Sequence, residues 1–329
     1  MKLADIGEFG LIERIRQRAS GDEDLPLGIG DDCSVAQLPA GRQLLTTTDM
    51  LLEDVHFRRA WTDLRTLGRK CVAVNVSDIA AMGGCPRHVY VGLALPDSLQ
   101  LEEIDALLDG LLEGCQRYGA TLAGGDTCRS HSGLVVSVTV QGHIAAGRAV
   151  TRGGAGVDEL VCVSGTLGDS ALALADLMHD RPVDRWLLGR HLEPQARVGL
   201  GRALADQGLA TAMIDLSDGL LADLGHILES SEVGARIDLS DLPLSPAFRR
   251  RAGDDRALHD LALCGGEDYE LLFTAAERHW PLVQQLAEST ATPVSRIGRI
   301  TDRRDLAILD AAGRPYRPSG SGFDHFPGA

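Results

Sequence analysis

The chain has 329 residues, of which 44% are hydrophobic and 24% charged, and a formal net charge of −15 at pH 7. This length and composition indicate a globular protein of two domains and exclude a disordered chain or a coiled coil. The sequence contains no apolar run of the roughly 18 residues that a membrane span needs. An acidic chain without a basic cluster is not expected to bind nucleic acid, although acids can hold small phosphates through divalent cations.

The N-terminus and the cysteines both indicate a cytoplasmic protein with no membrane association. Residues 8–18 place Phe9, Ile12 and Ile15 at helical spacing among acids, so this stretch reads as a mature amphipathic helix and not as a signal peptide. The seven cysteines contain no CxxC pair, which favours scattered reduced thiols over a disulfide framework or a zinc site.

The first half of the chain alternates predicted helices and strands. Apolar spacing predicts helices over 8–18, 63–82 and 101–119, and β-prone runs predict strands over 42–49, 88–96, 121–126 and 134–144. The glycine-rich stretch 151–159 reads as a linker or hairpin. The domain boundary is therefore expected near residue 150, with domains over 1–150 and 151–329.

The second half has the same character without repeating the sequence. Helices are predicted over 168–178, 195–207, 220–231 and 278–289, and strands over 160–165, 211–217, 235–240, 268–275, 294–301 and 306–313. Interleaved helices and strands predict a mixed α and β fold of the α+β class, and leave the strand order open.

Acidic residues beside glycine, serine or threonine recur along the chain, mostly at the ends of β-prone runs. They lie in GIGDD (Asp31, Asp32), TTTD (Asp49), NVSD (Asp78), GGD (Asp126), DLSDG (Asp215, Asp218) and GGED (Glu267, Asp268). Glycine lets the backbone approach a ligand closely, and carboxylates and hydroxyls are ligands for hard cations. Any one of these acids taken alone is more often a turn or helix-cap residue.

Asp78 is the acid that this simpler interpretation explains least well. It falls inside a predicted helix, on the face that carries Cys71 and Met82. A carboxylate among buried apolar positions costs several kcal/mol unless a cation or a hydrogen-bond network compensates it. Several such acids together favour bound magnesium, which prefers oxygen ligands and shares them with nucleotide phosphates. The sequence contains no GxxxxGK[ST] phosphate loop, so a metal-dependent phosphate-transfer site of another kind is expected.

An ordered set of motifs spanning nearly the whole chain resembles the thiamine-monophosphate kinase family. The set comprises GEFGLIERI, GIGDDC, TTTDML, DVHF, AVNVSDIAAMGG, AGGDT, GRAVTRGGA, IDLSDGLLADLGHI, GGEDYELLF and GFDHF. This family shares an ATP-binding superfamily with aminoimidazole ribonucleotide synthetase, selenophosphate synthetase and a hydrogenase-maturation protein. The resemblance implies an aminoimidazole ribonucleotide synthetase-like fold, with an N-terminal domain for ATP, magnesium and dimerisation and a C-terminal α+β domain that completes the active site.

The resemblance also implies ligand contacts at individual positions. The residues that match magnesium ligands are Asp31, Thr47, Thr48, Asp49, Asp78, Asp126, Asp215 and Asp218. Those that match ATP contacts are Tyr118, Gly125, Arg152 and Ser217, and those that match contacts with thiamine monophosphate are His56, Glu267 and Phe323. The expected catalytic residues are Asp49, Asp78, Asp126 and Asp218. Family members often carry another aromatic in place of Phe323, so ring stacking is retained and a phenolic hydrogen bond is not.

The implied activity is ATP-dependent phosphorylation of thiamine monophosphate to thiamine diphosphate, by direct in-line transfer assisted by several magnesium ions. The acceptor is already a phosphate monoester and dianionic near neutral pH, so its oxygen needs no dedicated general base. Arg152 would add positive charge at the phosphates. The resemblance further implies a homodimer formed through the N-terminal half.

Two alternatives stay open at this point. The first is another enzyme of the superfamily, above all aminoimidazole ribonucleotide synthetase, from which His56, Glu267 and Phe323 distinguish the chain. Selenophosphate synthetase would need a cysteine within residues 1–32, and the hydrogenase-maturation protein a cysteine at the C-terminus, and the chain has neither. The second is a non-enzymatic acidic protein that binds divalent cations, against which the dispersal of the acids and the lack of an EF-hand loop argue.

Overall fold

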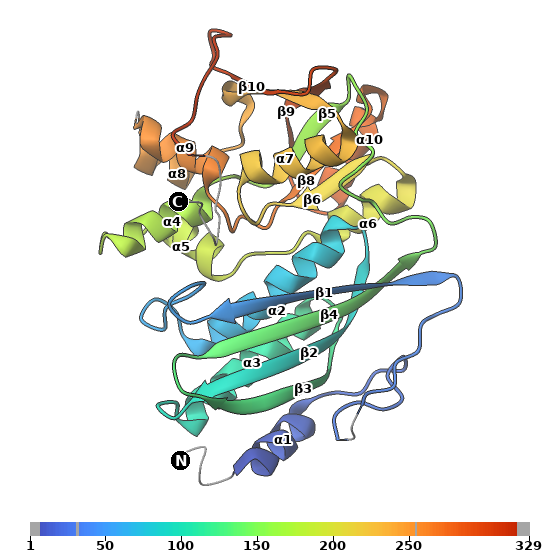
Figure 1. The fold of residues 1–329 in the computed structure, drawn as a ribbon, viewed down its shortest axis with the longest axis vertical. Coiled ribbons are helices and arrows are strands. Elements are labelled where there is room, and N and C mark those ends of the chain that lie inside the picture. Colours follow the sequence, from blue (N-terminus) through green and yellow to red (C-terminus); the bar gives the residue numbers. More distant parts are fainter. Residues whose placement is uncertain (1–6, 31–32, 254, 321–329) are drawn as a thin grey trace. The chain divides into compact units, whose positions relative to one another are not determined.

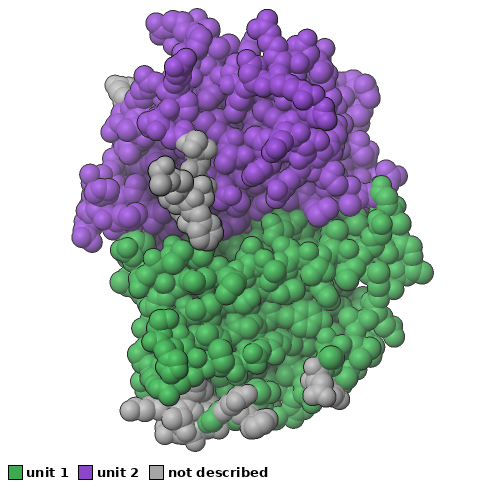
Figure 2. Space-filling view, viewed as in Figure 1, with its two compact units in different colours: residues 1–79, 84–147 green, residues 80–83, 148–329 purple. Residues whose placement is uncertain are grey.

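The computed structural model describes residues 7–30, 33–253 and 255–320. The chain forms two compact units, which Figure 2 shows in different colours. Unit 1 consists of residues 1–79 and 84–147, and unit 2 of residues 80–83 and 148–329. Asp31, Asp32 and Phe323 lie outside the described residues.

Unit 1 is a four-stranded sheet with two long helices over one face (Figure 1). The strands lie in the order β1 (Arg42–Leu52), β4 (Val135–Ala145), β2 (Cys85–Pro96) and β3 (Thr121–Ser130), with β2 and β3 parallel and the other two pairs antiparallel. The helices are α1 (Gly7–Arg18), α2 (Leu64–Ala81) and α3 (Leu101–Arg117). Strand β1 continues three residues beyond the predicted end at Asp49, because its pairing with β4 extends to Leu52.

Helices α2 and α3 approach each other closely through glycine. A Cβ atom on Gly68 would lie 2.4 Å from the carbonyl oxygen of Leu107, and one on Gly110 would lie 1.9 Å from that of Arg65. These distances leave no space for a side chain at either position. The two glycines therefore set the separation of the helices that cover the sheet.

Unit 2 contains a six-stranded sheet in which only the β10–β7 pair is parallel. The strands lie in the order β10 (Leu306–Leu309), β7 (Gly234–Asp238), β9 (Val294–Thr301), β5 (Leu160–Ser164), β8 (Leu271–Ala275) and β6 (Ala212–Asp215). Its helices are α4 (Asp169–Met178), α5 (Arg185–Leu192), α6 (Val198–Gln207), α7 (Leu220–Ser231), α8 (Pro246–Ala252), α9 (Arg256–Cys264) and α10 (Trp280–Ser289), with short 3₁₀ turns at Leu239–Asp241 and Glu277–His279. Both units confirm the predicted mixture of helices and strands.

Three short helices, α5, α8 and α9, were not predicted from the sequence. Each of them has at most nine residues, which is too short for apolar periodicity to stand out. Each begins with a side chain that caps the first turn: Asp184 accepts from the amide of Trp186, Ser245 from that of Phe248, and Asp255 from that of Ala257. In the sequence, the capping residues were therefore the available signal for the start of these three helices. Within the described residues, no helix is both long enough and apolar enough to cross a bilayer.

Candidate active site

Strand β1 and helix α2 bring four polar residues together in unit 1. The hydroxyl of Thr47 donates a hydrogen bond of 2.6 Å to Oδ2 of Asp78. The amide of Asp49 donates at 3.0 Å to Oδ1 of Asn75, a fully buried side chain whose Nδ2 donates to the carbonyl oxygen of Cys71. Asn75 thus fixes Asp49 against α2, one turn before Asp78. No role for Asn75 is expected from the sequence alone. A side-chain amide inside an otherwise apolar helix was the signal that this residue has a polar partner.

Asp49 and Asp78 are like charges held close together. Although Asp49 is exposed by its accessible area, desolvation by its surroundings and then the charge of Asp78 raise its pKa to about 6. Asp78 itself is half-buried, and Thr47 supplies part of the compensation that the sequence called for. The side chains of Thr47, Asp49 and Asp78 offer only oxygen atoms as metal ligands, and a divalent cation would relieve the repulsion, so these three side chains suit magnesium.

Thr48 is separated from Thr47 and Asp49 by the geometry of the strand. Successive side chains of a strand point to opposite faces of its sheet. The Thr48 hydroxyl lies 2.9 Å from that of Thr139, its partner on β4, and also donates to the carbonyl oxygen of Val138 at 3.1 Å. Its side chain therefore lies on the face away from Asp78.

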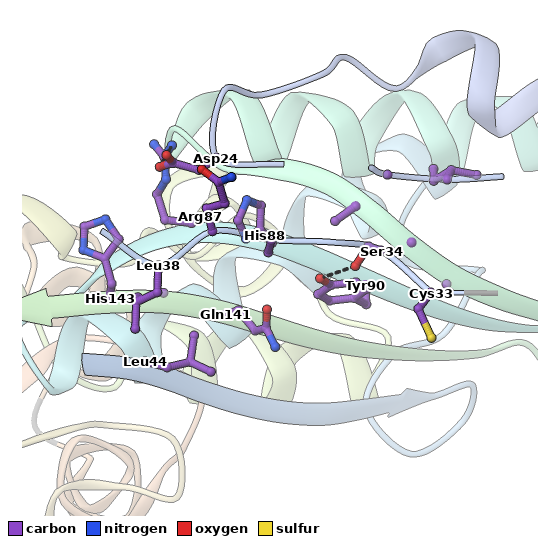
Figure 3. A pocket seen from close by; sticks show the side chains of 18 of the residues that line it. Asp24, Cys33, Ser34, Leu38, Leu44, Arg87, His88, Tyr90, Gln141 and His143 are labelled. Atoms are coloured by element: carbon purple, nitrogen blue, oxygen red, sulfur yellow. Dashed lines mark hydrogen bonds and ion pairs between the residues drawn. The ribbon is translucent and has the colours of Figure 1, made fainter. Parts of the chain in front are cut away.

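A groove of about 1150 Å³ lies between the sheet of unit 1 and residues 24–30 and 33–38 (Figure 3). Gly125 and Asp126 line it from strand β3, and all four strands contribute to it. A Cβ atom on Gly125 would be 2.1 Å from the carbonyl oxygen of Val91, so the strand pairing itself requires glycine there. Asp24, Arg87, His88 and His143 lie towards one end of the groove, and Cys33, Ser34 and Tyr90 towards the other (Figure 3).

The segment with the first glycine motif is anchored to strand β2. Arg87 Nη2 contacts Oδ1 of Asp22 at 3.1 Å and Oδ2 of Asp24 at 2.7 Å. Further along, the hydroxyls of Ser34 and Tyr90 lie 2.8 Å apart. These contacts hold the chain on both sides of Gly28 and Gly30, which line the groove.

Two other predicted residues of unit 1 lie at the ends of elements. The ring of His56 lies in the turn after β1, where Nδ1 accepts from the amide of Leu52 at 3.1 Å. In the neutral ring the hydrogen is therefore on Nε2. Tyr118 follows the last residue of α3 and does not line the groove.

Unit 2 brings Asp215, Ser217 and Asp218 together in the turn between β6 and α7. Asp223, which is 2% exposed, accepts hydrogen bonds of 3.1 Å from three consecutive amides, those of Ser217, Asp218 and Gly219. Burial, followed by the charge of Asp218, raises the pKa of Asp223 to about 7. Asp223 is not among the residues expected from the sequence to have a role in the site. Its place as an acid in the first turn of a helix was the signal that it could accept hydrogen bonds from the amides there.

The loop from Gly265 to Glu270 lies against this turn. The amide of Glu267 donates at 2.8 Å to the carbonyl oxygen of Ser217, and a Cβ atom on Gly266 would lie 2.2 Å from that same oxygen. Gly266 is thus required by the close approach of two backbones. The structure thereby places the predicted residue Glu267 beside Ser217 and Asp218.

Arg152 occupies a different position within unit 2. Its carbonyl oxygen accepts from Ser231 Oγ at 3.3 Å, at the C-terminal end of α7, whereas Ser217 and Asp218 precede the N-terminal end. The ends of this 12-residue helix are about 17 Å apart. Among the described residues, no three carboxylate, imidazole or thiol groups lie close enough together to hold a metal ion by themselves.

Comparison with known proteins agrees with the motifs. The N-terminal domain of the AIR synthase related proteins matches residues 30–144, and their C-terminal domain matches residues 156–310. Thiamine-monophosphate kinase of Escherichia coli strain K12 is 39% identical over 326 residues, which cover 97% of this chain and 98% of that protein.

Two solved structures extend the similarity to three dimensions. Thiamine-monophosphate kinase from Stenotrophomonas maltophilia K279a is 41% identical, with a TM-score of 0.83 over 92% of this chain and 96% of that one. AaThiL complexed with AMPPCP and TMP is 33% identical, with a TM-score of 0.76 over 98% of both chains. The resemblance inferred from the motifs is confirmed, and the chain belongs to the thiamine-monophosphate kinase family of AIR synthase related proteins.

Proposed function

We propose that the protein transfers the γ-phosphoryl group of ATP to thiamine monophosphate, giving thiamine diphosphate and ADP. The observation that carries the proposal is identity of 39% over nearly the whole length of a thiamine-monophosphate kinase, with both AIR synthase related domains present. A relative in complex with AMPPCP and TMP supports the same pair of substrates.

The roles of individual residues are part of the proposal. Magnesium would be held by Asp31, Thr47, Thr48, Asp49, Asp78, Asp126, Asp215 and Asp218. Because the Thr48 hydroxyl lies on the face away from Asp78, Thr48 could contribute beside Asp78 only through its backbone. ATP would contact Tyr118, Gly125, Arg152 and Ser217, and thiamine monophosphate would contact His56, Glu267 and Phe323. The groove that Gly125 and Asp126 line is large enough for a nucleotide.

The chemistry asked of the chain is positioning and charge control. The acceptor phosphate is dianionic and needs no general base, so direct in-line transfer without a phosphoenzyme is expected. Asp49, Asp78, Asp126 and Asp218 would supply the carboxylates. Thr47 holds the carboxylate of Asp78 in place, and Asn75 holds the backbone amide of Asp49. Magnesium, when bound, would neutralise charge on the two polyanions.

We also propose that the protein is a cytoplasmic homodimer that associates through unit 1. Strand β1 exposes Leu44 and Met50, 53% and 55% accessible, on the same face as Thr48. Exposed apolar side chains on a sheet face favour association with a second surface. Sedimentation velocity measures the association state, and Met50→Glu should shift the protein towards the monomer.

One assay tests the activity. Purified protein is given ATP and magnesium with thiamine monophosphate, thiamine or formylglycinamidine ribonucleotide in parallel, and ADP and thiamine diphosphate are measured. Turnover is expected only with thiamine monophosphate. Turnover with formylglycinamidine ribonucleotide alone would assign the chain to aminoimidazole ribonucleotide synthesis instead.

Asp78→Asn tests the carboxylate site. The variant keeps an oxygen that can accept from Thr47 and loses the charge, so turnover should be abolished while the circular dichroism spectrum is unchanged. Incubation with γ-labelled ATP alone should leave the wild-type protein unlabelled, and a labelled protein would contradict direct transfer.

A further inference from the structure

Helix α5 presents two consecutive side chains to the loop that carries Glu267. Arg190 and His191 lie in its last turn and are 9% and 3% exposed. Arg190 Nη2 donates to the carbonyl oxygen of Asp268 at 3.0 Å and to Oε1 of Glu270 at 2.8 Å. One helix end therefore contacts this loop at several neighbouring positions.

His191 contacts the side chain of Glu267 itself. Its Nδ1 lies 3.3 Å from Oε2 of Glu267 and 3.0 Å from the hydroxyl oxygen of Ser170 on α4. A carboxylate oxygen next to a ring nitrogen favours hydrogen on that nitrogen, because a lone pair there would repel it. The histidine side chain is 3% accessible and the glutamate side chain 25%. A buried donor thus orients a carboxylate that remains accessible.

The backbone around Glu267 has an unusual conformation. Glu267 and Tyr269 have φ values of 65° and 50°. This is the left-handed backbone region, which residues other than glycine, asparagine and aspartate seldom adopt. Their amides donate to the carbonyl oxygens of Ser217 and Leu216, both at 2.8 Å. Such a conformation persists only when its surroundings hold it from several sides.

An ion cluster around the fully buried carboxylate of Glu270, at the end of the loop, completes the support. Glu270 accepts from Ser164 Oγ at 2.5 Å, from Arg190, and from Arg197 Nε at 2.7 Å. A buried carboxylate with this many donors is costly to disturb, since removing one partner leaves charge without compensation. The last residue of the loop, Glu270, is therefore fixed. The Glu267 side chain, which is 25% accessible, is the part of the loop that still needs a partner to set its orientation.

We propose that His191 is a positioning residue that holds the Glu267 carboxylate in the orientation that thiamine monophosphate requires, with Arg190 fixing the backbone beneath it. This inference rests on the proposed function, which assigns Glu267 to that substrate. His191 acts through Glu267 and sets affinity for the acceptor, and it has no part in binding ATP.

The experiment is a double-mutant cycle on the full chain. Steady-state kinetics are measured for wild type, His191→Ala, Glu267→Gln and the double variant, with thiamine monophosphate and ATP varied separately. Loss of the charge-assisted contact should raise KM for thiamine monophosphate about tenfold in His191→Ala and leave KM for ATP within about twofold. The double variant should be no worse than Glu267→Gln alone, because the histidine then has no carboxylate to orient.

Two further variants separate positioning from general structural damage. His191→Asn keeps an N–H donor near the position of Nδ1 and should restore KM for thiamine monophosphate to within about threefold of wild type. His179→Asn, at the exposed end of α4, where the ring contacts only the carbonyl oxygen of Ala175 among the described contacts, should leave both KM values unchanged. If His191→Ala does not fold, the cycle is run with His191→Phe, which keeps a ring of similar shape and has no nitrogen to donate a hydrogen bond.

The outcomes are distinct. Equal changes in both KM values, additive effects of His191→Ala and Glu267→Gln, or no rescue by asparagine would each overturn the positioning role. Absence of thiamine diphosphate formation by the wild-type protein would instead overturn the proposed function, and this inference with it.

Discussion

Thr47 on strand β1 donates a hydrogen bond of 2.6 Å to Asp78 on helix α2, across 31 positions of sequence. The bond joins the TTTD and NVSD motifs within unit 1. It orients the carboxylate of Asp78, whose charge acts on the neighbouring carboxylate of Asp49. Hydrogen-bond partners of metal ligands affect metal affinity as well as geometry. Removing the Thr47 hydroxyl should therefore change the magnesium concentration that the protein needs for turnover.

Replacing Thr47 by valine removes the hydroxyl and keeps the β-branched shape. We expect the magnesium concentration for half-maximal turnover to rise at least about tenfold, as for other residues that support metal ligands. Thr47→Ser retains the donor and should remain within about threefold of wild type. ADP formation as a function of magnesium concentration measures both, and an unchanged magnesium response in Thr47→Val would show that the hydroxyl is dispensable.

Asp223 should stabilise the turn between β6 and α7. Asp223→Ala leaves one buried and two half-buried amides without their acceptor, which at roughly 1 kcal/mol each should lower the free energy of unfolding by about 3 kcal/mol. Asp223→Asn keeps one acceptor oxygen and should lose about half as much. Urea denaturation at pH 5, below the raised pKa of Asp223, compares them, and equal losses in the two variants would contradict the role of the accepting oxygen.

Asp268 should make stability depend on pH. Its burial, together with the charges of Asp169 and Glu270, raises its pKa to about 7 from an ordinary value of 3.8, although the amide of Gly168 and Arg190 act the other way. A raised pKa in the folded state contributes stability that is complete below about pH 4 and is lost as the pH rises through 7. The full contribution is about 4 kcal/mol for a shift of about three units.

Asp268→Asn removes that titration. The free energy of unfolding of the variant relative to wild type should therefore increase between pH 4 and pH 8, which urea denaturation at several pH values measures. Asp260 is the matched control: desolvation acts to raise its pKa, but hydrogen bonds from Tyr316 and Ser319 lower it overall. Its contribution is complete above the unfolded pKa of about 4 and is lost on further acidification. The stability of Asp260→Asn relative to wild type should therefore stay level between pH 4 and pH 8 and rise only below pH 4.

Two helical glycines should respond in opposite ways to alanine. Gly110→Ala places a methyl group against the carbonyl oxygen of Arg65 and should destabilise unit 1 by about 3 kcal/mol or prevent folding. Gly225 on α7 has no atom within 4 Å of an added Cβ, so Gly225→Ala should stabilise the protein by about 0.5 to 1 kcal/mol. Urea denaturation compares the two, and a stable Gly110→Ala protein would contradict the close approach of α2 and α3.

Local signals predicted most elements but could not predict which side chains meet. The spacing of apolar residues located α2 and placed Asp78 within it, yet nothing near Asp78 in the sequence indicates Thr47. The three threonines of TTTD look alike, and only the pairing of β1 with β4 shows that Thr48 faces Thr139 and not Asp78. Contacts of this kind depend on strand register, which sequence periodicity does not contain.

The loop around Glu267 illustrates the same limit in unit 2. The sequence predicts that its glycine pair lets the backbone approach a ligand, whereas Gly266 is required by the carbonyl oxygen of Ser217. The resemblance supplied the proposed role of Glu267. His191 was not a candidate, because α5 is eight residues long and its apolar pattern is weak. The support of a site by a short helix becomes visible only when the helix is in place.

The three amides that Asp223 occupies have a consequence for how the protein handles phosphate. In many nucleotide-binding folds, consecutive amides at the start of a helix are left open as an anion cradle. Here an internal carboxylate already fills that cradle at the start of α7. This helix end is therefore closed to phosphate oxygens, and a phosphate bound near it would have to be held by groups other than these three amides.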